Sequence, residues 1–283
     1  MPKRKAIVKS KDTKIYPIKV NQAKLNESLE KYPLPNTPFF WVLLGRIRSG
    51  KSLITQNIAL RKDPFYYDDF QVKILISPTA SNDAQCEHMI EDFDFVFESY
   101  SEELLGEIID MIENEAHDRK YLLVLDDAIS DGFRQTRAGK PDKFSSMITR
   151  FRHIGSKVTG TEGLLSIILT VQYWKFLSPI VRNNFQALCI CGKFSDSELN
   201  KISEQMDYIG GSSKKFLELY KQTQTDKFNF CYVNVTNMEM YRNFDELIWS
   251  EDMEDKLTEP EKDELEIEEI PELKEEDALK NPK

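Results

Sequence analysis

Residues 39–52 read Phe-Phe-Trp-Val-Leu-Leu-Gly-Arg-Ile-Arg-Ser-Gly-Lys-Ser, an apolar run that stops abruptly at Gly45 and is followed by a helical pattern after Gly50. This order predicts a buried strand, a loop that binds phosphate and a helix that runs from position 51 to about position 60. The loop fits the pattern G-x-x-x-x-G-K-[ST], whose fixed positions are here Gly45, Gly50, Lys51 and Ser52. Strand, loop and helix therefore form the first unit of the predicted fold.

Each residue type in this loop has a chemical reason to be there. The glycines let backbone N–H groups wrap a nucleotide's phosphates, Lys51 reaches the β and γ phosphates, and the Ser52 hydroxyl ligates Mg²⁺. The positive end of the helix dipole points at the same anion. We therefore assign nucleotide binding to the whole loop, which comprises Gly45, Arg46, Ile47, Arg48, Ser49, Gly50, Lys51 and Ser52. The alternative, a plain strand-to-helix turn, is disfavoured by the buried strand before the loop and the amphipathic helix after it.

The charge of the chain is unevenly distributed. The composition, 40% hydrophobic and 11% aromatic, is that of an ordinary soluble globular protein with one large domain or two small ones. The net charge of −10 arises in residues 251–283, which hold 15 of the 48 acidic and 5 of the 38 basic side chains. The other 250 residues thus carry 33 of each sign. Overall acidity is therefore no argument against a nucleic-acid partner.

Composition predicts three parts: a basic arm at 1–35, a P-loop domain at 36–250 and an acidic tail at 251–283. The arm ends in Tyr32-Pro33-Leu34-Pro35, whose prolines mark an extended entry to the first strand. It is either a flexible solvated arm or an electrostatic handle for nucleic acid. The tail has the composition of a disordered segment. Its role is solvation, competition with DNA phosphates for basic loops, or binding of a basic partner.

The cysteines and the first residues bear on the compartment. Neither C-x-x-C spacing nor a nearby pair of histidines accompanies the four cysteines, which we interpret as core thiols: Cys86, Cys189, Cys191 and Cys231. Residues 1–24 contain eight Lys or Arg and one Asp but no apolar segment, so they do not form a secretory signal. No stretch approaches the ~20 apolar residues that span a bilayer. We expect a soluble protein of a reducing, intracellular compartment.

Hydrophobic patterns predict an α/β fold. Apolar runs predict further buried strands at 72–77, 121–125, 164–171 and 187–191, and an alternating run predicts the last strand of the sheet at 228–235. Helices are predicted at 101–112, 145–150, 195–206 and 213–222, and a helix followed by a loop at 83–100. Strands this apolar suit a mainly parallel central sheet that is flanked by helices.

Two carboxylates, Asp126 and Asp127, follow the apolar run at 121–125. Carboxylates at the carboxyl end of a buried strand lie where an α/β sheet opens its ligand crevice. In a P-loop protein Asp126 would hold the Mg²⁺ shell opposite Ser52, and Asp127 would orient or deprotonate the attacking water. The alternative is a turn, in which Asp-Asp is also ordinary.

Gln172 directly follows the strand at 164–171. A glutamine in this place can hydrogen-bond both a γ-phosphate oxygen and the attacking water, and so report whether the nucleotide is intact. An isolated glutamine is otherwise an ordinary strand terminus, and that alternative stays open at this point.

Residues 132–163 concentrate glycine and cationic side chains. Scattered surface charge is the usual explanation of such a stretch. Two sharper hypotheses are a DNA-facing loop from Arg134 to Lys143 and an arginine finger at Arg150 or Arg152. A finger would stabilise transition-state charge on the nucleotide of a neighbouring subunit.

Taken in order, these features resemble one superfamily. The set consists of the loop at 45–52, Ser77-Pro78-Thr79, Leu125-Asp126-Asp127, Arg152-His153, Thr170-Val171-Gln172 and Arg182-Asn183. It resembles the FtsK-HerA superfamily, and within it the poxvirus-type genome-packaging ATPases of large DNA viruses, virophages and related elements. The resemblance covers roughly residues 33–240 and leaves both charged ends outside. It implies a P-loop NTPase fold of the RecA-like, additional-strand type.

The resemblance also implies roles for single residues. The phosphate-binding lysine matches Lys51, the Mg²⁺ hydroxyl matches Ser52, and the strand-end acid pair matches Asp126 and Asp127. The strand-end glutamine matches Gln172. Many members of the superfamily have Glu where Asp127 stands, so the shorter side chain leaves open which group is the general base; Asp127 would act through a longer hydrogen bond to the water.

Arginines at the subunit boundary are implied as well. The arginine that acts on a neighbouring subunit best matches Arg152, and Arg150 is close enough to compete for this role. Arg182 falls where the superfamily often carries a second arginine near the boundary.

The function implied is that of an ATP-driven translocase of double-stranded DNA that packages a viral genome into a capsid. Its cofactors would be ATP and Mg²⁺. Its partners would be double-stranded DNA, other copies of the chain in a hexameric ring, and capsid vertex proteins. Its place would be the host cytoplasm, a viral factory or the virion.

Other functions remain as alternatives. One is a nucleotide-gated assembly or interaction protein of the P-loop class without motor activity, and another is a related DNA helicase or translocase outside packaging. A nucleoside kinase is disfavoured by Gln172 and the long basic insertion. The absence of an Asn-Lys-x-Asp motif argues against a GTPase.

Overall fold

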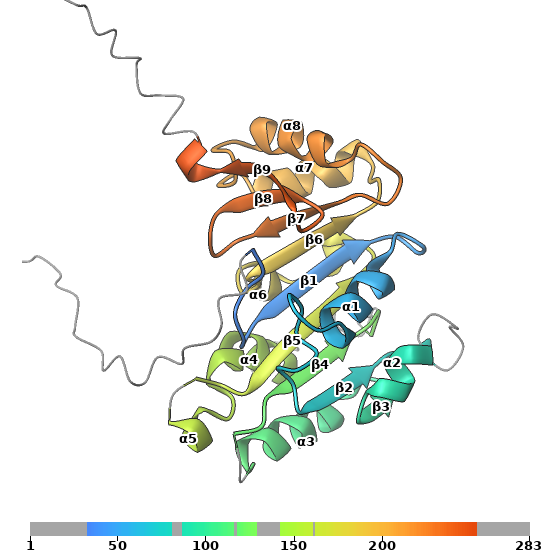
Figure 1. Ribbon diagram of the computed structural model, residues 1–283, viewed down its shortest axis with the longest axis vertical. Helices are drawn as coiled ribbons and strands as arrows, with labels where there is room; N and C mark the ends of the chain where they lie inside the picture. The colour runs from blue at the N-terminus through green and yellow to red at the C-terminus, as the bar shows by residue number, and fades with distance from the viewer. Residues whose placement is uncertain (1–32, 81–86, 116–117, 129–141, 161, 254–283) are drawn as a thin grey trace, which may run out of the picture. The chain divides into compact units, whose positions relative to one another are not determined.

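The computed structural model describes residues 33–80, 87–115, 118–128, 142–160 and 162–253. Within these ranges nine strands form one sheet in the order β3-β2-β4-β5-β1-β6-β7-β8-β9. The six strands from β3 to β6 in this order are parallel, and β7, β8 and β9 add to them antiparallel. The prediction of a mainly parallel α/β sheet is therefore confirmed (Figure 1).

The central strands are short and fully buried. They are β1 (Phe40–Gly45), β2 (Val72–Ile76), β4 (Tyr121–Leu125), β5 (Leu165–Val171) and β6 (Ala187–Cys191). Every residue of these five strands is buried, because helices cover both faces of the sheet. Their bounds agree with the predicted runs to within one residue at each end.

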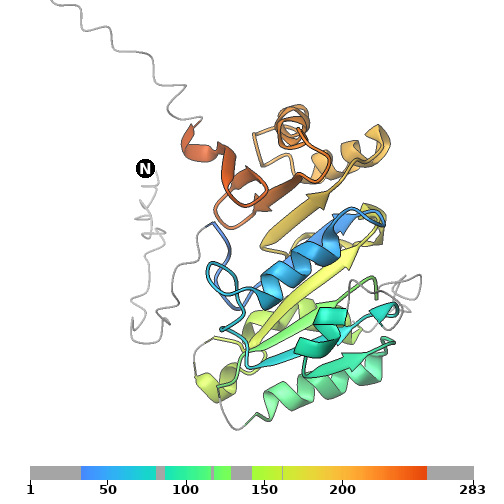
Figure 2. The same ribbon diagram turned by 45° about the vertical axis from the view of Figure 1, so that its right-hand side comes forward.

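The helices divide between the two faces. One apolar cluster joins alternate residues of β1, including Trp41 and Leu43, to α1 (Lys51–Leu60) and α2 (Glu87–Asp92). The other face carries the remaining long helices, α3 (Glu102–Glu113), α4 (Lys143–Arg150), α7 (Asp196–Gln205) and α8 (Ser213–Thr223). Figures 1 and 2 show α1 lying across β1 and β5. The helix predicted from position 51 to about position 60 is thus confirmed.

Short helical segments join these elements. They are the 3-10 turns η5 (Phe151–His153) and η6 (Trp174–Phe176) and the single-turn helices α5 (Ser156–Thr159) and α6 (Pro179–Arg182). Local chemistry fixes several helix starts: Ser101 caps α3 through the Leu104 N–H, and Asp142 caps α4 through the Ser145 N–H. None of the described helices is long and apolar enough to cross a membrane.

Two predictions about the sheet were wrong. The segment after α2 was expected to be a loop, but it contains a three-residue strand, β3 (Phe95–Phe97), that pairs with β2. The strand β7 (Phe230–Asn234) was expected to be the last, but β8 (Glu239–Arg242) and β9 (Glu246–Ser250) follow it. Both errors concern short strands at or near the edges of the sheet. β3 has only three residues and β8 has a charged residue at each end, so neither shows a long apolar pattern.

Of the predicted basic arm, residues 33–35 lie in the described ranges. Residues 33–35 pack on the sheet: the Pro33 carbonyl accepts hydrogen bonds from the Tyr232 hydroxyl at 2.8 Å and from the Asn234 amide at 2.9 Å. The rest of the predicted basic arm, the segment 134–141 and nearly all of the acidic tail lie outside the described residues. The three described cysteines, Cys189, Cys191 and Cys231, are buried free thiols, as predicted.

The core beneath α1 generates a stability prediction. The Trp41 ring is fully buried and stacks on Tyr232 with ring centroids 5.4 Å apart and planes 10° apart. We expect Trp41→Ala to lower the free energy of unfolding by ~3–5 kcal/mol, since it removes this contact and leaves a cavity. Urea unfolding measures the change. The control is Phe228→Ala at a side chain that is 72% exposed, which we expect to change stability by less than about 0.5 kcal/mol.

Candidate active site

The loop after β1 is shaped by its contact with β6. A Cβ atom on Gly45 would lie 2.3 Å from the Ser49 Oγ and 2.8 Å from the carbonyl oxygen of Cys191. Only glycine fits there, so the first fixed position of the motif reflects a close approach of two backbones. Gly192, with φ 80°, continues β6 beneath Ser49. The loop therefore rests on the end of the neighbouring strand.

The start of α1 is suited to an anion. Arg48 (φ 62°) and Gly50 (φ 97°) adopt left-handed conformations, which turn the chain tightly into the helix. Gly50 offers no capping side chain, and the first turn of α1 contains no acidic residue. The N–H groups of that turn are therefore left for a ligand. The Ser49 Oγ is buried without a hydrogen-bond partner in the described residues, so a polar atom faces the same loop. These features fit a phosphate group.

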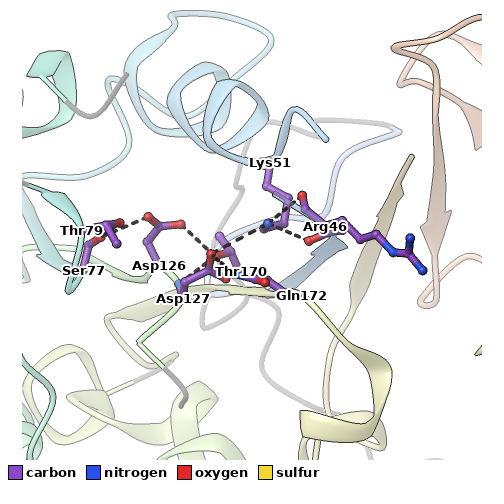
Figure 3. A network of polar contacts seen from close by, with 9 residues as sticks. Arg46, Lys51, Ser77, Thr79, Asp126, Asp127, Thr170 and Gln172 are labelled. Carbon is purple, nitrogen blue, oxygen red and sulfur yellow. Dashed lines mark hydrogen bonds and ion pairs between the residues drawn. The ribbon is translucent and has the colours of Figure 1, made fainter. Parts of the chain in front are cut away.

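Lys51 is buried at the centre of the site, with 5% of its surface exposed. Its Nζ donates hydrogen bonds to the carbonyl oxygens of Gly45 at 2.7 Å and Arg46 at 3.4 Å. It also lies 4.0 Å from the Oδ2 of Asp127. The ammonium group is thus held between the phosphate loop and the end of β4 (Figure 3).

Asp126 is held by hydroxyl groups from the two strands beside β4. Its Oδ2 accepts from the Ser77 Oγ at 3.1 Å, and its Oδ1 accepts from the Thr170 Oγ1 at 2.8 Å. Burial raises the pKa of Asp126, and the neighbouring charge of Asp127 adds to the rise. The two hydroxyl donors and Lys51 act in the opposite direction on this pKa without cancelling it.

Asp127 connects the carboxylates to Lys51 and Gln172. Its φ of 44° lies in the left-handed region, which aspartate tolerates better than most residues. Its N–H donates to the Thr170 Oγ1 at 2.9 Å, and its Oδ2 accepts from the Gln172 Nε2 at 3.1 Å. Figure 3 shows these side chains near one another, at the ends of β4 and β5 and at the start of α1. Four predicted site residues, Lys51, Asp126, Asp127 and Gln172, are therefore brought together.

The site also has oxygen donors that fit Mg²⁺. Ser52, half-buried in the first turn of α1, and Asp126 supply a hydroxyl and a carboxylate. Mg²⁺ prefers oxygen ligands and commonly combines one or two protein ligands with substrate phosphates. The described residues hold no cluster of three or more His, Cys, Asp or Glu that would bind a metal by itself. A metal here would accordingly take its remaining ligands from phosphates and water.

Arg152 and Arg150 lie away from this cluster. The carbonyl of Arg152 accepts from the Gly163 N–H at 2.8 Å, just before β5 begins, whereas Gln172 follows the end of β5. A seven-residue strand separates the two ends by roughly 20 Å. Arg152 lines a cavity of about 300 Å³ at that far end, together with Glu162 and Gln186. Arg150 is paired instead with Glu113 at the end of α3, at 3.7 Å.

Arg182 is engaged within its own chain. Its Nε donates to the Leu177 carbonyl at 2.7 Å, its Nη1 donates to the Gln205 Oε1 at 2.9 Å, and its guanidinium lies 5.6 Å from the Trp174 ring. Burial lowers the pKa of Arg182. These contacts tie the connection between β5 and β6 to α7. The structure does not bring Arg150, Arg152 or Arg182 to the carboxylates of the same chain.

Three supporting residues were not given roles by the sequence. Ser77 and Thr170 hold Asp126, and Gly192 supports the phosphate loop. Ser77 and Thr170 are hydroxyl residues at or near the carboxyl ends of buried strands, and both belong to the residue set that carries the family resemblance, but no role was assigned to them. Their contacts depend on which strands are neighbours, and the sequence does not state that order.

Comparisons with solved structures identify the fold. The genome packaging NTPase B204 of Sulfolobus turreted icosahedral virus 2, in complex with AMP, is similar with a TM-score of 0.54 and 17% identity, over 74% of this chain and 98% of that one. Its complex with AMPPCP gives 0.51 and 16%, over 74% and 98%. B204, the DNA-packaging ATPase of Sulfolobus turreted icosahedral virus, gives 0.52 and 17%, over 72% and 96%.

The chain has a P-loop NTPase fold. In this fold β5 lies between β1, which leads into the phosphate loop, and β4, which leads into the carboxylates. The fold predicted from the resemblance, with an additional strand in this position, is thereby confirmed. No model of a protein family matches the sequence, and no curated protein matches it significantly.

The buried carboxyl group of Asp126 generates a prediction about pH. Because its pKa is raised in the folded protein, the folded state holds this proton more tightly than the unfolded state. Stability should therefore fall as pH rises from the ordinary aspartate pKa through the raised one. In metal-free buffer near neutral pH, we expect Asp126→Asn to melt a few degrees above the wild type.

Asparagine keeps the partners of Asp126, since its carbonyl accepts from Thr170 and its amide donates to Ser77. We expect the difference in melting temperature to vanish below about pH 4, where the wild-type carboxyl is protonated. Thermal unfolding at several pH values measures it. The control is Asp68→Asn at an exposed side chain, and an Asp126→Asn protein that is less stable at neutral pH would contradict the prediction.

Proposed function

We propose that the chain is an ATPase whose hydrolysis of ATP drives the translocation of double-stranded DNA during packaging of a viral genome. The observation that carries the proposal is the polar network that joins Lys51 of the phosphate loop to Asp127, Gln172, Thr170 and Asp126. Likeness in fold to packaging NTPases that were crystallised with AMP and with AMPPCP supports the same class of substrate.

Binding of ATP would begin at the loop. Lys51 is positioned to transfer its hydrogen bonds from the carbonyls of Gly45 and Arg46 to oxygens of the β and γ phosphates. The N–H groups at the start of α1 would receive the remaining phosphate charge. Ser52 and Asp126 would hold Mg²⁺, which supplies charge neutralisation on the phosphates when it is bound.

Hydrolysis would then depend on Asp127. Its carboxylate orients a water molecule and accepts one of its protons, while the water oxygen bonds to the γ-phosphorus and the bond to the bridging oxygen breaks. The left-handed backbone of Asp127 and its hydrogen bond from Gln172 fix the direction of the carboxylate. Gln172 contacts that carboxylate and would lie close to a γ-phosphate bound at Lys51. It is therefore suited to couple the state of the nucleotide to β5.

A neighbouring copy would complete the site. Arg152 is exposed at the opposite end of β5 from Gln172, so it can serve only the nucleotide of another subunit. An arginine that acts in this way is worth ~10³ or more in rate. A hexameric ring, with Arg150 and Arg182 as further boundary residues, is the assembly we propose. DNA would pass through its centre, and capsid vertex proteins would be its docking partners.

The primary test is phosphate release from ATP with Mg²⁺, with and without linear double-stranded DNA. We expect hydrolysis that DNA stimulates several-fold, and Lys51→Ala to reduce it by at least ~100-fold, because the phosphates lose their central cation. The matched control is Lys62→Ala, which removes an exposed lysine just after α1. Absence of ATP hydrolysis by the wild type would refute the proposal that the chain is an ATPase. Hydrolysis by an assembled oligomer that ignores DNA would refute the motor and favour a nucleotide-gated assembly protein.

Sharing of sites between subunits has its own test. We expect Asp127→Ala and Arg152→Ala each to be inactive alone, but a 1:1 mixture to recover activity, since about a quarter of randomly formed interfaces would combine an intact Asp127 with an intact Arg152. The matched control is a mixture of Arg152→Ala with the Asp127→Ala/Arg152→Ala double variant, in which no subunit has Arg152. Equal activity in the two mixtures would count against sites that are completed by a neighbour.

A further inference from the structure

Two exposed apolar side chains are located at the end of the sheet that carries the site. Among the large hydrophobic side chains in the described ranges, Ile47 and Phe228 have the highest exposure, 72% each. Ile47 belongs to the phosphate loop. Phe228 lies in the segment that connects α8 to β7. An aromatic ring this exposed, at the end of the sheet that carries the site, is accessible to a ligand, and the hydrophobic effect would favour its being covered.

Strand register places Phe228 near the phosphate loop. Gly45 at the end of β1 pairs with Cys191 at the end of β6, and Cys191 pairs with Phe230 at the start of β7. Neighbouring strands are 4.7–4.9 Å apart, so Gly45 and the start of β7 are separated by about 10 Å. Figures 1 and 2 both show the segment between α8 and β7 at the same end of the sheet as the loop after β1. This separation is of the order that a nucleotide places between its base and its phosphates.

Phe228 lies in a turn that several hydrogen bonds hold in place. The Asn229 N–H donates to the Asp226 carbonyl at 3.2 Å, and the Asn229 amide donates to the Thr225 Oγ1 at 2.8 Å. Asn243, in the turn after β8, donates to the Asn229 Oδ1 at 3.3 Å and accepts from the Phe230 N–H at 3.2 Å. The ring is therefore presented on a backbone that is already fixed, which limits the entropy lost when a ligand binds.

We propose that Phe228 stacks on the base of the bound nucleoside triphosphate. This inference rests on the proposed function, because it takes the phosphates to lie on the loop at 45–52. The Nζ of Lys227 lies 5.1 Å from the ring centroid of Phe228, over one face of the ring. A positive charge would therefore lie close to a base that stacks on Phe228.

Stacking has a consequence for specificity. Every base has a π face, so an aromatic platform holds purines without reading their edges. The chain also lacks the Asn-Lys-x-Asp motif that reads guanine. The site therefore binds a nucleobase but discriminates weakly between ATP and GTP. Its selectivity for nucleoside triphosphates comes from the contacts to the triphosphate and from stacking of the base on the Phe228 ring.

Calorimetric titration of the full chain in Mg²⁺ buffer tests this with three probes: ATP, GTP and inorganic tripolyphosphate. Phe228→Ala should weaken ATP and GTP about 10-fold each, the usual loss for one stacked base, and leave tripolyphosphate affinity unchanged. Phe228→Trp should restore both nucleotides to wild-type affinity or better. The matched control is Phe95→Ala, which removes a partly exposed phenylalanine from β3 at the far edge of the sheet and should change nothing.

Unchanged affinity of Phe228→Ala for ATP would overturn the inference, as would an equal loss for ATP and tripolyphosphate. A variant that binds ATP as the wild type does but no longer assembles would overturn it too, in favour of a subunit contact. A wild type that binds none of the three probes would instead refute the proposed function. A wild type that binds tripolyphosphate as tightly as ATP would refute the base contact alone.

Discussion

The parallel register of β4, β5 and β1 is the constraint on which the site depends. Leu125 pairs with Leu169 and Leu44 pairs with Val171, so the residues that follow on each strand emerge side by side. The next step along the first pair sets Asp126 beside Thr170, and their 2.8 Å hydrogen bond is the direct result. A slip of one residue would turn every side chain of a strand to the opposite face. The hydrophobic core and the polar network therefore enforce the same register.

Burial strengthens the electrostatic interactions of Lys51 and Asp126, and it also lowers the stability of the folded chain. Lys51 and Asp126 are each 5% exposed, and charges removed from water are costly unless they are paired and hydrogen-bonded. Two hydroxyl donors serve Asp126 and two carbonyls serve Lys51, yet burial still raises the pKa of Asp126. This carboxylate is thus less stable where it stands than in water. A bound metal ion would offset that penalty, because its positive charge favours the ionised carboxylate.

The sequence predicted the parts of the fold that leave a strong local pattern. The strand at 187–191 and the helix from 51 to 60 were found at their bounds, because a continuous apolar run and a glycine before a helix are unambiguous. Short strands at or near the sheet edges were missed, since β8 has a charged residue on each side of Met240 and Tyr241 and β3 has only three residues. The roles of Ser77 and Thr170 were missed for another reason. Their contacts are set by strand order, which local patterns do not contain.

The position of Arg152 was equally beyond the sequence, and it changes what the arginine can do. Gln172 and Arg152 flank the same strand at its two ends, roughly 20 Å apart, which is more than an arginine side chain can span. Rearrangement of the side chain alone cannot close that gap, because β5 is fully buried and paired on both sides. In the assembly proposed above, Arg152 would accordingly contact the nucleotide of another copy. The proposed site would then have two halves at opposite ends of one sheet, and β5 would be the element that connects a change in one half to the next copy.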